Sequence, residues 1–131
     1  MELQLKIIDV LLIILALIHI GLPKYFDWKN NLVNLSPFNK QVFKVHTFFI
    51  ALVVFLMGVL CLSSADLLIK TELGRRISLG LGIFWSTRMF FQFFVYSKDL
   101  WRGKTFETII HILFSCLWTY FSIVFLKIYF S

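Results

Sequence analysis

The three histidines of the chain are its most specific chemical signal, because each falls in a different apolar run. His19 stands near the end of the first run, His46 near the start of the second, and His111 near the start of the fourth. At 1.5 Å of helical rise per residue, antiparallel spanning helices would hold all three within roughly 10 Å of one membrane interface. Imidazoles at one depth can bind a metal ion or hydrogen-bond a ligand, so this layer is the predicted site.

The third run adds two polar side chains, Arg88 and Gln92, which lie one helical turn apart on one face. A charged side chain at the centre of a spanning helix costs about 2.5 to 3.5 kcal/mol on insertion scales. Arg88 is therefore expected to face the bundle interior and to meet a carboxylate, a carbonyl or a bound anion. Asp9, or Glu107 through a bridging group, is a candidate partner. In the alternative interpretation, Arg88 and Gln92 only hold neighbouring helices together by hydrogen bonds.

The residue types leave the ligand of this site open. Five side chains from four runs form the predicted ligand-binding set: His19, His46, Arg88, Gln92 and His111. Two facing imidazoles could hold haem, as helical bundles do. A non-haem metal would be held by a set of four residues: His19, His46, His111 and Glu107. The 16 phenylalanines could instead line a pocket for an isoprenoid quinone or an acyl chain. Each histidine could also be satisfied by backbone, headgroup or water and bind nothing.

Four apolar runs must position these side chains. The chain has 131 residues, of which 60% are hydrophobic, and its mean hydropathy is +0.86. The length of the runs and the need to pair every backbone group inside lipid predict an all-α fold, a polytopic membrane protein built as a four-transmembrane-helix bundle. We expect a single domain over residues 1–131, with spans near the following residues: 5–22, 37–63, 76–97 and 105–128.

Local signals predict where three of these helices begin or end. Ser36-Pro37 is typical of a helix start, with serine as the N-cap and proline at the first helical position. Gly21 and Pro23 predict the end of the first helix, and Thr105 is a candidate N-cap for the fourth.

The net charge of +6 is spread over every loop and forms no basic stripe. This distribution favours contact with lipid headgroups in the bilayer and argues against a nucleic-acid partner. Four spans would put both termini on one side of the membrane with five Lys and Arg residues, against seven on the side of the histidine layer. The positive-inside rule then favours a cytoplasmic location for the histidine layer.

Two stretches of the chain resemble known membrane proteins. The segment Ala16-Leu-Ile-His-Ile-Gly-Leu-Pro-Lys24, at the close of the first run, resembles the small bacterial DoxX-like membrane proteins. The segment from Phe93 to His111 is similar to uncharacterised small bacterial membrane proteins. This resemblance implies a multi-pass protein of the bacterial inner (plasma) membrane, and it implies no particular activity.

Two hypotheses of function follow from these residues. In the first, the protein binds a small molecule, a metal or a lipid-like cofactor at the His/Arg/Gln site, with redox or transfer chemistry as one use of it. In the second, it is a non-catalytic accessory subunit whose polar residues secure contacts with partner helices of another membrane protein or of a second copy. The chain offers no nucleophile beside an ordered base, no phosphate loop and no carboxylate pair, so the sequence does not support a hydrolase or a kinase.

Overall fold

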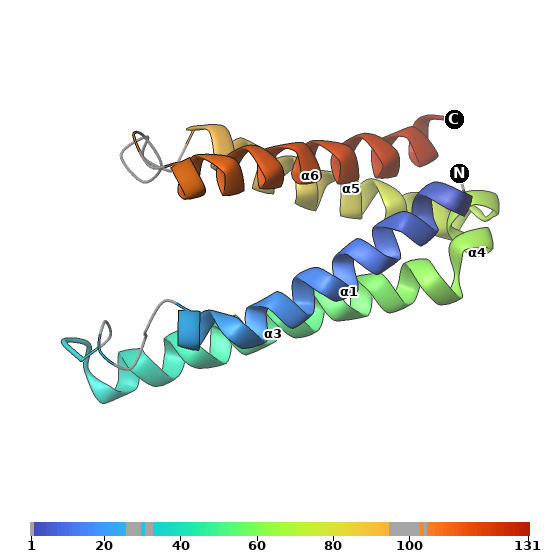
Figure 1. The fold of residues 1–131 in the computed structure, drawn as a ribbon. Helices are drawn as coiled ribbons and strands as arrows, with labels where there is room; N and C mark the ends of the chain where they lie inside the picture. The colour runs from blue at the N-terminus through green and yellow to red at the C-terminus, as the bar shows by residue number, and fades with distance from the viewer. Residues whose placement is uncertain (1, 26–29, 31–32, 95–102, 104) are drawn as a thin grey trace. The chain divides into compact units, whose positions relative to one another are not determined.

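The described part of the protein is helical. The computed structural model describes residues 2–25, 30, 33–94, 103 and 105–131, and within them it contains no strand. The helices are α1 (Glu2–Tyr25), α3 (Pro37–Ser63), α4 (Ala65–Lys70), α5 (Glu72–Phe94) and α6 (Thr105–Phe130) (Figure 1). The all-α prediction is therefore confirmed for this part of the chain. The helices fall into two compact units, an N-terminal unit over Leu3–Ala65 and a C-terminal unit over Asp66–Ser131 to which Met1–Glu2 is also assigned.

Three stretches of helix are long and apolar enough to cross a membrane. They are Glu2–Gly21, Pro37–Ser63 and Thr105–Phe130. This finding agrees with a multi-pass membrane protein at the level of helix length and composition. Helix α5 is less hydrophobic than these three, because it carries charged residues in its first turns and the polar Arg88 and Gln92 further along.

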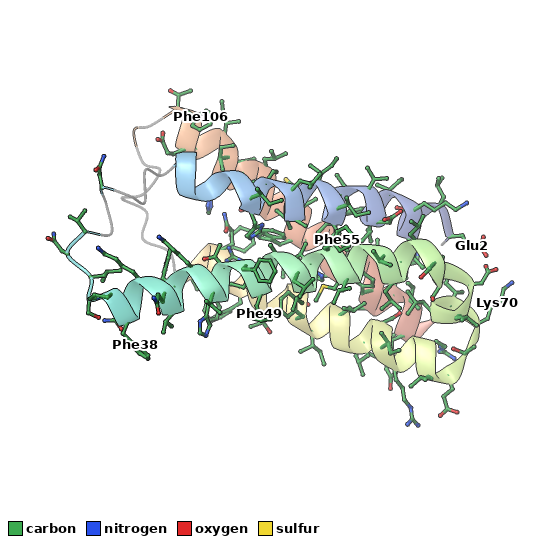
Figure 2. All side chains as sticks on the ribbon, turned by 90° about the horizontal axis from the view of Figure 1, so that it is seen from below. Glu2, Phe38, Phe49, Phe55, Lys70 and Phe106 are labelled. Carbon is green, nitrogen blue, oxygen red and sulfur yellow. The ribbon has the colours of Figure 1, made fainter. Side chains whose placement is uncertain are left out.

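The N-terminal unit pairs α1 with α3 in antiparallel directions. Figure 2 shows Glu2, at the start of α1, at one end of the pair and Phe38, at the start of α3, at the other. The helices approach closely at Gly58, where an added Cβ atom would lie 2.9 Å from Cγ1 of Ile13 and 3.3 Å from the carbonyl oxygen of Asp9. The buried side of α1 follows helical spacing and consists of Leu5, Ile8, Asp9, Leu12, Leu15 and Ala16.

The start of α3 lies where the sequence predicts it. The side chain of Ser36 accepts a hydrogen bond from the backbone N–H of Asn39 at 3.2 Å, and Pro37 is the first helical residue. The serine oxygen thus satisfies one of the amide groups that a helix leaves unpaired at its N-terminus. The predicted N-cap and start of this helix are confirmed.

The predicted end of the first helix is wrong. Helix α1 continues through Gly21 and Pro23 to Tyr25. A proline this close to a helix end removes only one backbone hydrogen bond, and continuing the helix keeps the remaining groups of that turn paired. Helix α6 begins at Thr105, in agreement with the predicted start of the fourth span at residue 105. Thr105 is a helical residue and not the predicted N-cap, a difference of one position that is common because terminal residues are only half in the helix.

Helix α5 begins earlier than predicted, at Glu72 instead of near residue 76. The hydroxyl of Thr71 accepts a hydrogen bond from the backbone N–H of Gly74 at 2.9 Å, which makes Thr71 the N-cap of this helix. The same hydroxyl donates to the carbonyl of Leu67 at 2.6 Å and so ties the end of α4 to the start of α5. Polar residues that looked like a connecting loop are therefore the first turn of a helix.

Helices α5 and α6 pack side by side in antiparallel directions. At one end the Arg75 guanidinium donates to the backbone carbonyls of Tyr129 at 2.8 Å and Ser131 at 2.7 Å. Such contacts satisfy carbonyl groups that a helix leaves unpaired in its last turn. Further along, Gly82 lies against Leu126, because an added Cβ would come within 2.7 Å of its side chain. At the other end Gln92 contacts His111. The two helices are thus in register over most of their length.

Candidate functional site

An aromatic cluster lies at the middle of the C-terminal unit, where α5 and α6 face each other. The indole rings of Trp85 and Trp118 stack with their centroids 5.0 Å apart and their planes at 13°. Phe121 meets Trp85 edge-on at 5.0 Å, and Phe114 stacks on Trp118 at 5.4 Å. Trp85 and Trp118 are buried, with 2% and 5% of their surface exposed. We refer to Trp85, Phe114, Trp118 and Phe121 as the aromatic cluster.

Both tryptophans of the cluster carry an unsatisfied hydrogen-bond donor. The Nε1 atoms of Trp85 and Trp118 are buried and have no hydrogen-bond partner among the described residues. Leaving a buried donor unpaired costs about 1 to 3 kcal/mol, and buried tryptophans usually find a partner for this group. Two such donors on stacked rings are therefore a feature that packing alone does not account for.

Arg88 places a positive charge on this cluster. Its guanidinium carbon lies 5.4 Å from the centroid of the Trp118 ring, within the range of a cation–π interaction. Arg88 stands three residues after Trp85 on α5, so the two side chains share a face of the helix. The sequence predicts an inward-facing Arg88, and in the C-terminal unit its charge lies over the helix interface. Asp9, one of its predicted partners, belongs to the N-terminal unit.

Gln92 and His111 link α5 and α6 one turn beyond Arg88. The amide nitrogen of Gln92 lies 2.8 Å from Nδ1 of His111 and 3.4 Å from the His111 carbonyl oxygen. An amide NH₂ group only donates, so Nδ1 of His111 is the acceptor, and the proton of the neutral ring is on Nε2. The hydroxyl of Ser115 also donates to the His111 carbonyl, at 2.7 Å. Counting helical depth from the sequence placed Gln92 and His111 at one level, and the structure puts them in direct contact.

The other two histidines of the predicted site belong to the N-terminal unit. Nδ1 of His19 donates to the carbonyl of Leu15 at 2.8 Å, and Nδ1 of His46 donates to the carbonyl of Val42 at 2.8 Å. Each ring is therefore tied to its own helix by one nitrogen. His46 is exposed and His19 is partly buried. A layer containing all three histidines spans both units and stays a prediction.

The four predicted metal ligands are likewise divided between the two units. His19 and His46 lie in one unit, and His111 and the exposed Glu107 lie in the other. Within the described residues, no group of three or more His, Cys, Asp or Glu side chains is placed to hold a metal ion. In addition, the lone pair on Nδ1 of His111 is occupied by Gln92. The haem and non-haem metal sites therefore stay predictions.

Sequence reasoning missed Trp85. The pattern of α6 includes Trp118 in a stripe with His111, Ser115 and Ser122, but a tryptophan in an apolar run normally counts as a packing residue. The spacing of the residues could have identified it. Trp85 is one turn before Arg88 and two turns before Gln92, so it lies on the same face of α5 as these two residues. That face is the one that α6 covers.

Comparison of the chain with protein-family models, with curated proteins and with solved structures finds no match. The similarity to DoxX-like proteins accordingly stays a prediction, and the geometry of the α5–α6 pair alone defines the candidate site.

Proposed function

We propose that this chain is a four-span membrane protein that binds a lipid-soluble molecule with a carbonyl or carboxylate head at the aromatic cluster. The observation that carries the proposal is the pair of buried indole N–H groups on Trp85 and Trp118, without partners in the described part of the chain. The Arg88 guanidinium lies over one of these two rings, 5.4 Å from the centroid of Trp118. All of these groups donate hydrogen bonds and none accepts one, so the complementary ligand is an acceptor or an anion.

The same groups favour an organic ligand over a metal ion. A metal needs lone pairs, but indole and guanidinium nitrogens provide none. The Nδ1 lone pair of His111 already accepts a hydrogen bond from Gln92, so it is not available to a metal ion. The aromatic side chains around these donors give the site apolar surroundings, which suit a quinone-like ring or the start of an acyl chain. We therefore assign the site to a quinone-like or fatty-acid-like molecule.

Helix α5 is the proposed fourth span. With 23 residues it is about 34 Å long at 1.5 Å per residue, enough for a hydrocarbon core of about 30 Å. It also follows α6 from the contact of Arg75 with Tyr129 to that of Gln92 with His111. If α6 crosses the bilayer, an antiparallel helix in register with it crosses as well. The polar side chains of α5 would then be sheltered from lipid by α6, as intramembrane polar residues usually are.

The proposal is tested by titrating decylubiquinone and oleate into the purified protein in mild detergent and measuring heat. Replacing Trp85 or Trp118 with phenylalanine keeps the ring and removes the donor, and each change is expected to weaken binding about 5- to 10-fold, as for one hydrogen bond. Arg88→Leu should weaken the binding of oleate about 10- to 150-fold, because hydrogen bonds to a charged group contribute about 1.5 to 3 kcal/mol.

The matched control is Arg76→Leu on the same helix, since Arg76 is exposed and pairs with Glu72 one turn earlier. Exposed pairs of this kind contribute little, so this variant should bind both probes like the parent. The proposal is wrong if the parent protein binds neither probe, or if Arg88→Leu binds oleate as Arg76→Leu does. Loss of thermal stability in Arg88→Leu without loss of binding would favour the accessory-subunit hypothesis, in which Arg88 only secures helix contacts.

A further inference from the structure

A buried carboxyl group, that of Asp9, belongs to the N-terminal unit. Asp9 has 4% of its surface exposed, and it lies on α1 inside the stretch Glu2–Gly21 that can cross a membrane. It occupies the same side of the helix as Leu5 and Leu12, one turn before and after it, and both are fully buried. The chain thus places an acidic group where an apolar one would pack.

The Asp9 carboxyl has no compensating partner in the described part of the chain. Its Oδ1 atom is buried without a hydrogen bond, and Asp9 forms no ion pair with a described residue. An ionised carboxylate out of water is costly unless it is paired, and such a group usually becomes neutral instead. Ionisable residues within membrane spans are for this reason functional candidates by default.

The neighbours of Asp9 on α3 are small: Gly58, which has no side chain, and Cys61, whose protonated thiol carries no charge. Gly58 lets the two helices approach, with an added Cβ only 3.3 Å from the Asp9 carbonyl oxygen. Cys61, one turn further along α3, is buried and lies within electrostatic range of the carboxyl group. On α1 itself, Lys6 stands three residues earlier and is exposed. The Cys61 thiol and the Lys6 ammonium group are thus two titratable groups near Asp9 among the described residues of this unit.

We propose that Asp9 is a proton-binding site in the membrane-spanning part of the N-terminal unit. In the bound state one carboxyl oxygen carries the proton, and the O–H bond can donate to a backbone carbonyl of the preceding turn, a pattern open to short polar side chains in helices. In the released state the carboxylate requires water or a cation to approach between the helices. The site therefore takes up and gives back one proton, and it needs no other ligand.

The test uses dicyclohexylcarbodiimide, an apolar reagent that reacts with protonated carboxyl groups. The acid O–H adds across one C=N bond of the reagent to give an O-acylisourea, which rearranges to a stable N-acylurea, so nothing leaves and the peptide gains the mass of the reagent. The full-length protein in lipid vesicles is labelled at neutral pH, and the modified residue is located by peptide mass spectrometry. We expect one adduct, on Asp9, and less of it as the pH is raised, because only the protonated form reacts.

Controls separate this outcome from reaction elsewhere. Cys61→Ser should label like the parent, which shows that the thiol is not the group modified. The exposed carboxyl groups of Asp66 and Glu72 should react with a water-soluble carbodiimide at low pH and not with the apolar reagent at neutral pH. Asp9→Asn should lose the adduct, but the site assignment in the parent protein does not depend on the folding of this variant.

Two results would overturn the proposal. One is the absence of an Asp9 adduct in the parent protein while Asp66 and Glu72 are labelled by the water-soluble reagent. The other is protection of Asp9 by sodium ions at constant pH, which would make a monovalent cation the occupant of the site.

Discussion

Replacing Gly74 with alanine is expected to lower the free energy of unfolding of the protein by about 2 to 3 kcal/mol, the upper part of the range for steric overpacking. A Cβ atom built on Gly74 would overlap the carbonyl oxygen of Leu67 and lie 2.6 Å from the Cα atom of Leu68. Both are backbone atoms of α4, so no rotamer change can relieve the contact. The α4–α5 corner must open, and with it the Thr71 N-cap that holds the start of α5.

Gly80→Ala is the matched control, because it makes the same change on the same helix. No described atom lies within 4 Å of a Cβ at Gly80. Alanine is the better helix former by about 1 kcal/mol, so this variant should be as stable as the parent or slightly more so. Thermal unfolding in detergent, followed by circular dichroism at the helical bands, compares the three proteins. Equal melting temperatures for Gly74→Ala and Gly80→Ala would contradict the described corner.

The second large effect is expected at the contact between α1 and α3. Gly58→Leu should destabilise the protein by about 1 to 3 kcal/mol, because a branched side chain must displace Ile13 and the backbone of Asp9. Gly21→Leu provides the control in the same unit, since no described atom lies within 4 Å of a Cβ there. Both variants add an equally apolar side chain to a helix, so the comparison removes the general effect of leucine on membrane partition.

The comparison is made by titrating both variants with sodium dodecyl sulfate in mixed micelles and recording the midpoint of helix loss. We expect the midpoint to fall for Gly58→Leu and to stay near the parent value for Gly21→Leu. Equal midpoints would mean that α1 and α3 do not pack at Gly58. In that case the burial of Asp9 beside this glycine would also need another explanation.

The sequence predicts helices well where a local signal acts on the backbone directly. Ser36-Pro37 defines the start of α3 because the serine oxygen and the ring of proline both suit the first turn. The same reasoning fails at Pro23 and before Glu72, where the gain from pairing backbone groups outweighs the local signal. A proline or a cluster of charges indicates the region in which a helix begins or ends. The backbone hydrogen bonds of that turn determine the residue at which it does so.

Side-chain partners were harder to predict than depth. Counting residues along antiparallel helices predicts that Gln92 and His111 lie at the same depth in the bundle, because depth depends only on the helical rise. The two side chains are in contact in the structure. The partner of a ring nitrogen depends on its rotamer, and no periodic pattern reveals that His19 and His46 turn back to carbonyls of their own helices. Trp85 was missed for a related reason, because its indole counts as apolar until its N–H lacks a partner.

Helix α5 is expected to cross the membrane, and the accessibility of single cysteines on either side of it is the test. In a Cys61→Ser, Cys116→Ser background, Lys70→Cys reports the position before α5, and Thr105→Cys reports the start of α6; both residues are exposed. A membrane-impermeant maleimide is applied to right-side-out and to inverted vesicles. We expect the two cysteines to react from opposite faces of the membrane. Reaction of both cysteines from the same face would contradict it, because α5 would then not span the bilayer.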